Sequence, residues 1–191
     1  EASGMKRMVA SIALLLPLGF DTNTMTVLLI WALFALSLGM MWGFAGLLSF
    51  GHSAYFGLGA YGAGLSMRAA GLPMEAALVA GPLVAALGAV LFGWFSVRLS
   101  GVYLAMLTLA FAQIAWAVVY QWDGFTGGSN GLTGVWPAEW LSDKRSYYYL
   151  TLAFVVGGVL LLRRMLFSPF GYAMRAARDS VLRADAIGID V

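Results

Sequence analysis

Long apolar stretches separated by short polar segments dominate the chain from residue 8 to residue 167. The run from Thr22 to Met67 contains no Asp, Glu, Lys or Arg. A membrane-spanning helix needs about 20 predominantly apolar residues, so this run is long enough for two spans. Leu83–Phe95 lacks the apolar/polar alternation of a membrane β-strand. Since only helices and closed barrels satisfy their backbone in hydrocarbon, the pattern favours helices.

The pattern predicts an all-α fold, a polytopic membrane helix bundle with about six spans. The expected spans are Met8–Phe20, Thr24–Ala45, Ser53–Met67, Ala76–Val97, Gly101–Trp122 and Tyr147–Leu162. A polar stretch, residues 123–146, separates the last two. The first segment has only 13 residues and contains Pro17, so a signal-peptide core and a short anchor both stay open. We prefer an uncleaved segment, because no small-x-small cleavage site follows it.

Composition agrees with a membrane protein and excludes several kinds of site. Hydrophobic residues make up 61% of the chain and charged residues 10%, against about 25% charged in soluble domains. The chain has no cysteine and one histidine, which excludes a disulfide framework and disfavours a zinc site. We therefore expect no metal ion and no cofactor in this chain.

Basic residues predict the orientation, because Lys and Arg accumulate in short cytoplasmic loops. With the N-terminus inside, eight basic residues fall on the inner face and three on the outer face. The inner set is Lys6, Arg7, Arg98, Arg163, Arg164, Arg175, Arg178 and Arg183, and the outer set is Arg68, Lys144 and Arg145. The sequence thus predicts a multi-pass protein with both termini in the cytoplasm.

Glycines at helical spacing indicate close helix packing. Gly57-x-Gly59-x-x-Gly62 has dinucleotide-binding spacing, but that motif needs a preceding strand, and here it lies in an apolar segment. Small residues four apart let membrane helices approach closely. We therefore assign the glycines of this region to helix packing, namely Gly43, Gly57, Gly59, Gly62 and Gly64.

The stretch GGSNG, residues 127–131, matches the G-x-S-x-G nucleophile elbow. That elbow needs a strand-to-helix turn and a histidine later in the chain, whereas the sole histidine, His52, precedes Ser129 by 77 positions. An intramembrane hydrolase pairing these two residues is thus disfavoured, and we expect no catalytic residue. The predicted topology also places them on opposite membrane faces.

Two interpretations of His52 stay open. It can be a helix-start residue that hydrogen-bonds across the turn between the second and third spans. It can also be a polar element of a translocation path, because polar groups at membrane depth are often functional. The candidate path residues are His52, Ser53, Ser129 and Asn130.

The C-terminal tail, Arg163–Val191, leaves the apolar pattern at Phe167. Ser168-Pro169 can begin a helix, because proline is tolerated in the first turn. Alanines then recur near one face, and Gly188 is a plausible helix end. The tail is predicted to be a short cytoplasmic amphipathic helix, which lies on lipid or docks in a groove of a soluble partner.

Four segments together carry a family resemblance: GFAGLLSFGHSAYFGLGAYGAGL, GVYLAMLTLAFAQI, FTGGSNGLTGV and SPFGYAMRAARDSVLRADAIGIDV. In this order and spacing, over most of residues 24–191, the chain resembles the membrane permease subunits of bacterial branched-chain amino acid ABC transporters. Urea and short-chain amide permeases are close relatives and share much of the pattern.

The resemblance implies an ABC importer permease: one permease domain over residues 1–191, forming part of an import pore in the bacterial inner membrane. Its implied partners are a second permease subunit, two cytoplasmic ATPase subunits and a periplasmic substrate-binding protein. The lipid bilayer surrounds it, and no nucleic acid is expected to bind. Residues 168–190 resemble the cytoplasmic coupling segment that docks on the ATPase. The coupling residues carried over are Phe170, Gly171, Arg175, Arg178, Ala184, Ala186 and Gly188.

ATP hydrolysis is expected in the partner chains, since no G-x-x-x-x-G-K-[ST] motif occurs here. The chain is therefore not expected to be an enzyme. Family members usually continue with further spans after the coupling segment, whereas this chain stops at Val191, which leaves C-terminal truncation open. A urea or amide permease and a non-transporting membrane scaffold are the alternative functions.

Overall fold

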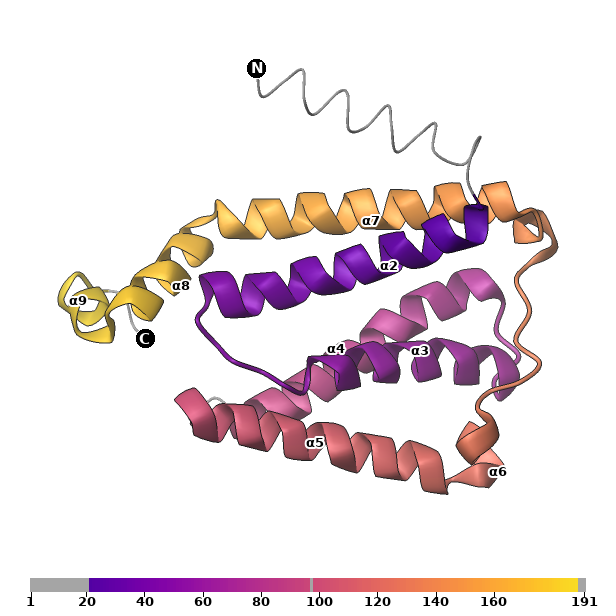
Figure 1. The fold of residues 1–191 in the computed structure, drawn as a ribbon, viewed down its shortest axis with the longest axis horizontal. Coiled ribbons are helices and arrows are strands. Elements are labelled where there is room, and N and C mark those ends of the chain that lie inside the picture. Colours follow the sequence, from indigo (N-terminus) through magenta and orange to yellow (C-terminus); the bar gives the residue numbers. More distant parts are fainter. Residues whose placement is uncertain (1–20, 97, 189–191) are drawn as a thin grey trace, which may run out of the picture. The chain divides into compact units, whose positions relative to one another are not determined.

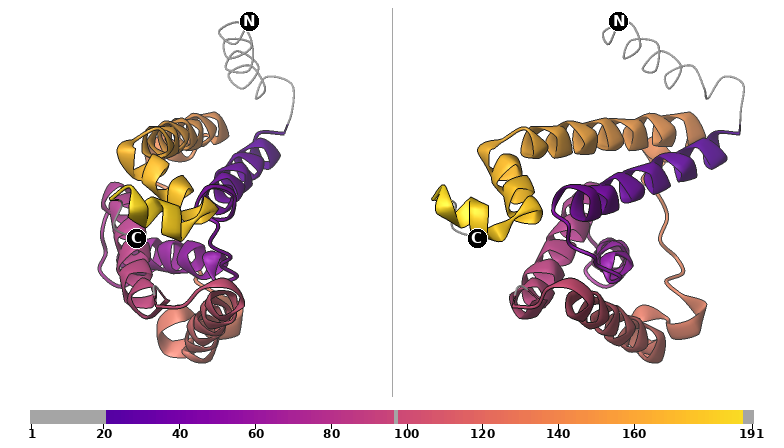
Figure 2. Two further views of the ribbon diagram at one scale, coloured as in Figure 1. Left: turned by 90° about the vertical axis from the view of Figure 1, so that its left-hand side faces the viewer. Right: turned by 60° about the vertical axis from the view of Figure 1, so that its left-hand side comes forward.

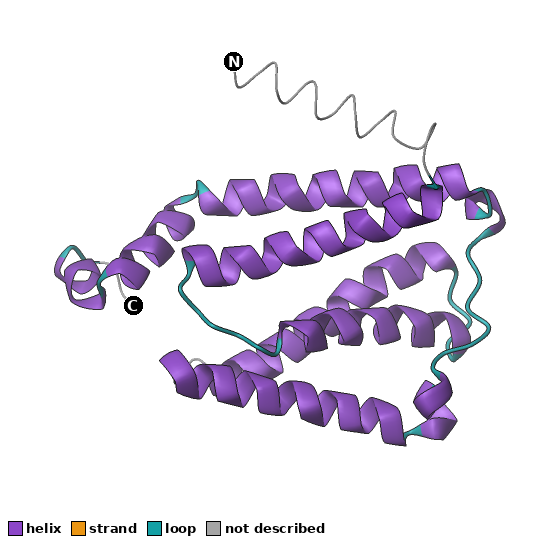
Figure 3. Ribbon diagram, in the orientation of Figure 1, coloured by secondary structure: helices purple, strands orange, loops and turns teal. Residues whose placement is uncertain are grey.

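The computed structural model describes residues 21–96 and 98–188, and among these residues it contains helices joined by loops and no β-strand (Figures 1 and 3). This confirms the all-α class. In chain order the elements are α2 (Thr22–Gly39), η2 (Met40–Phe44), α3 (His52–Arg68), α4 (Met74–Ser96), α5 (Gly101–Gln121), α6 (Asp123–Thr126), η3 (Gly128–Asn130), η4 (Glu139–Leu141), α7 (Lys144–Leu166), α8 (Pro169–Asp179) and α9 (Val181–Ala186).

Four helices in the described part of the chain are long and apolar enough to cross a membrane. They are Thr22–Phe44, Met74–Ser96, Gly101–Gln121 and Lys144–Leu166. The predicted segment Met8–Phe20 lies outside the described residues. The predicted span over residues 53–67 is helical as α3, but α3 has 17 residues, about 25 Å at 1.5 Å per residue. The chain is thus multi-pass, and six spans stay a prediction.

The long helices present large apolar side chains outward. In α4, Leu87 is 71% exposed and Trp94 is 70% exposed. Soluble proteins rarely expose apolar surface on this scale. In a membrane, lipid tails or neighbouring helices cover such surface and keep it from water. The outward faces therefore support the membrane assignment independently of helix length.

The chain divides into two compact units. The described part of the first comprises residues 21–37 and 139–173, in which α2 and α7 run side by side (Figures 1 and 2). A Cβ atom at Gly158 of α7 would lie 2.8 Å from Leu33 Cδ1 of α2, so the missing side chain lets the helices approach. Leu141 of η4 and Tyr148 near the start of α7 are buried.

The start of α2 is fixed by a side-chain cap. The Asp21 carboxylate accepts hydrogen bonds from Thr24 Oγ1 at 2.9 Å and from the Thr24 backbone N at 3.3 Å. The hydroxyl bond from Thr24 is the main cause that holds the pKa of Asp21 below its usual value. An acidic residue at this position also suits the positive end of the helix dipole.

The second unit consists of Leu38–Ala138 and Met174–Val191 and contains the packed helices α3, α4 and α5 (Figure 2). Its buried side chains include Ala77 of α4 and Leu104 and Ala105 of α5. The unit also contains most of α8 and all of α9. All residues predicted to line a path or to pack α3 lie in this unit.

The tail differs from the single helix that the sequence predicts. It forms two helices, α8 and α9, that are interrupted at Ser180. The backbone of Ser180 is extended (φ −167°, ψ 110°), and its side chain accepts a hydrogen bond from the Arg183 N–H. Serine competes well for the N-cap position, so a new helix starts there. Gly188 follows with φ +83°, as expected for a residue just past a helix end.

Candidate functional site

Helices α3 and α4 meet along a seam of small residues. A Cβ atom at Gly81 would lie 2.8 Å from the Gly59 carbonyl oxygen, and one at Gly62 would lie 2.7 Å from Val84 Cβ. Farther along, a Cβ at Gly88 would lie 2.7 Å from Leu58 Cδ1. Glycine thus allows the two backbones to approach more closely than any other residue would.

The predicted packing glycines fall into two groups. Gly59, Gly62 and Gly64 face neighbouring segments, with Gly64 close to Leu132. Gly43 and Gly57 face open space, since no described atom lies within 4 Å of the Cβ position. For these two, packing against another helix stays a prediction.

A pocket of about 310 Å³ lies between α3 and α5. Its polar lining comes from Ser53 and Tyr61 on α3 and from Tyr120 on α5, and Trp116 and Gly128 complete one wall. No charged side chain lines it. The pocket is therefore chemically suited to an apolar group beside a few hydroxyls.

The structure separates the four predicted path residues. Ser53 lines the pocket, while His52 is the first residue of α3 and Ser129 and Asn130 belong to η3. His52 is half-buried, with its ring 6.5 Å from that of Tyr55 in an edge-on arrangement. An aromatic series continues from Tyr55 through Phe92 to Phe111, with centroids 6.2 and 4.7 Å apart. His52 is thus the first ring of this aromatic series and does not line the pocket.

The GGSNG stretch forms a tight turn after α5. The φ values of Gly127, Gly128 and Gly131 are +80°, +52° and +70°. Residues other than glycine rarely adopt such backbone angles. The buried Thr126 hydroxyl lies 2.5 Å from the Val119 carbonyl and 2.8 Å from the Trp122 carbonyl. The backbone of this turn therefore explains the presence of these glycines without any catalytic role for Ser129.

Ser129 and His52 lie near opposite ends of α3. Gly64, close to the C-terminal end of α3, contacts Leu132 of the segment that follows η3, whereas His52 begins the helix. A catalytic pair of these residues has no geometric support. Among the residues that the structure describes, no group of three or more His, Cys, Asp or Glu side chains is placed to hold a metal ion.

The corner before α3 contains a contact that sequence reasoning missed. The Phe50 N–H donates to Thr108 Oγ1 at 3.2 Å, and the same hydroxyl donates to the Ala105 carbonyl at 3.0 Å. Gly51 packs so tightly on Thr108 that a Cβ would collide with its carbonyl oxygen. A buried threonine in an apolar segment is the signal, because such a hydroxyl needs a partner in a membrane.

The coupling residues carried over by resemblance occupy different environments. Phe170 is exposed, and Gly171 packs against the last carbonyls of α7, where a Cβ would collide with them. Ala184 is only 1% exposed, so the chain itself already covers its methyl group. Ala186 and Gly188 are exposed. Neighbouring apolar side chains, Leu182 at 84% exposed and Ile187 at 74% exposed, are open to a partner.

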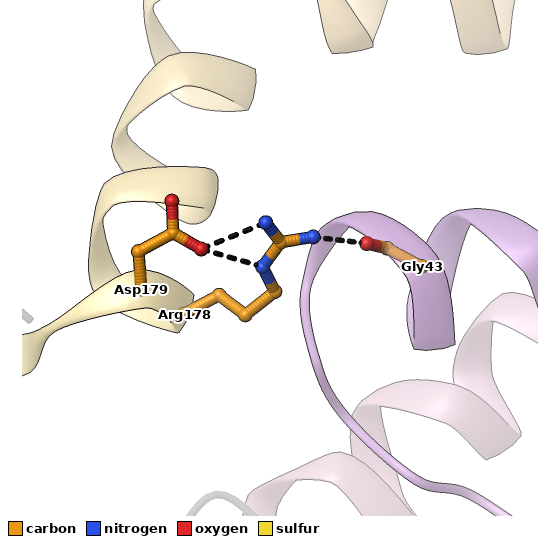
Figure 4. A network of polar contacts seen from close by, with 3 residues as sticks. All are labelled: Gly43, Arg178 and Asp179. Carbon is orange, nitrogen blue, oxygen red and sulfur yellow. Dashed lines mark hydrogen bonds and ion pairs between the residues drawn. The ribbon is translucent and has the colours of Figure 1, made fainter.

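Arg175 and Arg178 point back toward the end of η2. Arg178 Nη1 donates to the Gly43 carbonyl, and its guanidinium also pairs with Asp179 at 2.7 Å (Figure 4). The Arg175 guanidinium lies 5.3 Å from the centroid of the Phe44 ring, within the range of a cation–π interaction. Both arginines are thus engaged within this chain.

Comparisons with known proteins agree with one family. The family model described as "Branched-chain amino acid transport system / permease component" matches residues 22–191. The chain is 28% identical over 197 residues to the high-affinity branched-chain amino acid transport system permease protein LivM of Salmonella typhimurium, and this covers 88% of the chain and 46% of that protein. It is also 28% identical over 192 residues to LivM of Escherichia coli, covering 86% of the chain and 45% of that protein.

The chain therefore spans about half the length of the curated relatives that it matches. No solved structure matches it.

Proposed function

The chain belongs to the family of branched-chain amino acid transport permease components, and on this premise we propose that it forms part of the pore of an ATP-driven importer for branched-chain amino acids. The observation that carries the proposal is the family match, which extends over residues 22–191. The four apolar helices and the outward apolar side chains of α4 support a pore subunit embedded in the bacterial inner membrane.

The proposed complex contains this chain, a second permease subunit, two cytoplasmic ATPases and a periplasmic substrate-binding protein. Energy comes from ATP hydrolysis in the partner chains, and this chain performs no chemistry of its own. It crosses the membrane with both termini in the cytoplasm. The excess of basic residues on one predicted face supports that orientation.

In this proposal residues 168–190 dock on an ATPase subunit. Support comes from the exposed apolar side chains Phe170, Leu182 and Ile187, which a soluble partner would remove from water. Ala184 acts differently, since it is already buried and supports the position of α9.

The substrate path is proposed to pass along the pocket between α3 and α5. The lining suits a branched aliphatic side chain, because it is apolar except for hydroxyls such as those of Ser53 and Tyr120. His52 begins α3, and Ser129 and Asn130 belong to η3. These residues are proposed to border the two mouths of this path. Selection between substrates is assigned mainly to the binding protein.

Reconstitution tests the proposal. The chain is co-expressed with candidate second permease, ATPase and binding-protein chains from the same genome and placed in proteoliposomes. We expect ATP-dependent uptake of radiolabelled leucine that requires the binding protein. Uptake of urea but not leucine would point to the amide-type relatives. A chain that binds no ATPase and transports neither solute would contradict the proposal.

A further inference from the structure

Arg178 of α8 contacts the end of η2 and the segment that follows it, and we define residues 43–51, from the last two residues of η2 to the residue before α3, as the corner. Its Nη1 donates to the Gly43 carbonyl, while Nε and Nη2 lie 2.9 and 2.7 Å from Asp179 Oδ1 (Figure 4). Asp179 thereby orients the guanidinium toward the corner. Bonds of this charge-assisted kind are stronger than those between neutral groups.

The aliphatic stem of Arg178 also lies against the corner. A Cβ atom at Gly46 would lie 3.1 Å from Arg178 Cδ and 3.5 Å from Arg178 Cβ. Gly46 also has φ +69°, a conformation that disfavours other residues. The backbone of Gly46 therefore leaves the space that the stem of Arg178 occupies.

A second contact joins the same two elements. Arg175 precedes Arg178 by three residues and therefore shares its face of α8. Its guanidinium carbon lies 5.3 Å from the centroid of the Phe44 ring. Two arginines on one face of α8 thus contact the corner.

The far end of the corner is attached to the membrane helices. Phe50 donates its N–H to Thr108 of α5, and Gly51 packs against the Thr108 backbone. The next residues begin α3, whose first turn contributes Ser53 and Ala54 to the pocket. A continuous series of contacts thus runs from α8 through the corner to the pocket wall.

The start of the corner lies in an irregular helical turn. Residues 40–44 form a π-helix, a rare conformation that is found frequently at functional sites. Its last turn offers the Gly43 carbonyl to Arg178. The corner therefore meets α8 at a point where the regular helical ladder is already interrupted.

We propose that the corner, held by Arg178 and Arg175, transmits movement of the coupling segment to the start of α3. The inference rests on the proposed function, because it takes α8 to be the part moved by an ATPase. Arg178 is then a positioning residue that faces its own chain. The C-terminal end of α8 and the corner move as one body, and α3 follows because the corner is also its N-terminal boundary.

The first test uses Arg178→Met in the reconstituted complex, since methionine keeps an unbranched stem and removes the guanidinium. ATPase co-purification should persist, and basal ATP hydrolysis is measured in each variant as the reference for the stimulated rate. Hydrolysis stimulated by the loaded binding protein should fall roughly tenfold, within the range typical of coupling between sites. Arg164→Met removes an exposed arginine from the last turn of α7 and serves as the matched control, with normal stimulation.

Two results of this test overturn the inference. Normal stimulation in Arg178→Met means that the contact transmits nothing. Lost ATPase co-purification means that Arg178 binds the partner directly. A wild-type complex that fails to retain any ATPase is a different result, because it overturns the proposed function itself.

The second test uses the pair Gly46→Cys and Arg178→Cys in one chain that has no native cysteine. The Cβ positions are 3.5 Å apart, at the short end of disulfide geometry. The reduced pair should show the roughly tenfold loss, and oxidation should restore stimulated hydrolysis by replacing the lost contact with a covalent bond. Arg178→Cys alone should not recover.

If oxidation restores stimulated ATP hydrolysis and dithiothreitol abolishes it again, the result supports movement of α8 and the corner as one body. A disulfide that forms without recovery overturns it, as does a pair that does not cross-link in membranes under oxidant. Cross-linking needs only the chain in its membrane, so it measures the contact separately from ATPase binding.

Discussion

The backbone of Gly81 in α4 lies directly against the Gly59 carbonyl oxygen in α3, and a Cβ at Gly81 would come within 2.8 Å of that oxygen. The relationship is not symmetric. A Cβ at Gly59 would lie 3.5 Å from Ala85 Cβ and 3.5 Å from the Gly81 carbonyl oxygen, which is ordinary contact distance. One glycine of the pair is therefore required by sterics, whereas the other has room for a methyl group.

Gly81→Ala should destabilise the protein, and Gly59→Ala should not. Both changes improve helix propensity by about 1 kcal/mol, so their difference isolates the steric contact. We expect Gly81→Ala to lower the melting temperature in detergent relative to Gly59→Ala, measured by tryptophan fluorescence. Equal melting temperatures for the two variants would contradict the close approach of the backbones.

Gly62→Leu should damage folding or assembly. Its Cβ alone would lie 2.7 Å from Val84 Cβ, and overpacking typically costs about 1–3 kcal/mol. Gly93→Leu is the matched control, because nothing lies within 4 Å of that position. Size-exclusion chromatography of fluorescent fusions measures the monodisperse fraction, which should fall only for Gly62→Leu. A similar loss in both variants would indicate a general effect of leucine.

Thr108→Val should loosen the corner before α3. Valine keeps the shape but removes the hydroxyl that accepts the Phe50 N–H at 3.2 Å, and a buried donor without an acceptor costs about 1–3 kcal/mol. Thr108→Ser keeps the acceptor and should retain more stability than Thr108→Val. Hydrogen exchange at Phe50 provides the local measurement, with faster exchange expected in the valine variant alone.

The predicted topology can be tested with single cysteines, since the chain has none of its own. Ser129→Cys should react with an impermeant thiol reagent on intact cells, and Ser180→Cys should react only after the membrane is opened. Both side chains stand in short connecting segments, so access is not limited by burial in a core. Labelling of Ser180→Cys but not Ser129→Cys on intact cells would reverse the orientation.

Two substitutions in α9 should have different effects. Ala184 is 1% exposed, so Ala184→Glu buries a charge without a partner and should lower the yield of folded protein. Leu182 is 84% exposed, so Leu182→Glu should leave folding intact and weaken ATPase co-purification. Trp136→Glu, at a site 79% exposed in the loop before η4, should affect neither. Normal co-purification with Leu182→Glu would remove this face from the docking surface.

Helix formation and membrane character follow from the sequence itself. The length of an apolar run is a property along the chain, and hydrocarbon allows few backbone solutions, so α4, α5 and α7 were predictable near their observed bounds. The family was also recognisable, because four motifs in a fixed order do not depend on how the helices pack. The candidate coupling segment was found in the same way.

Contacts between segments required the tertiary structure. Gly57 and Gly62 belong to one sequence motif, yet only Gly62 meets a neighbour among the described residues, because the position of α4 decides which glycine is covered. The break at Ser180 likewise depends on a cap competing with helix continuation.

The contact between Arg178 and Gly43 joins residues 135 positions apart. No periodicity in either segment encodes it, because a backbone carbonyl carries no side-chain signal. Sequence thus determined which segments are helices and which solvent surrounds them. The fold decided at which glycines a side chain would collide with a neighbouring helix, and which arginine contacts its own chain.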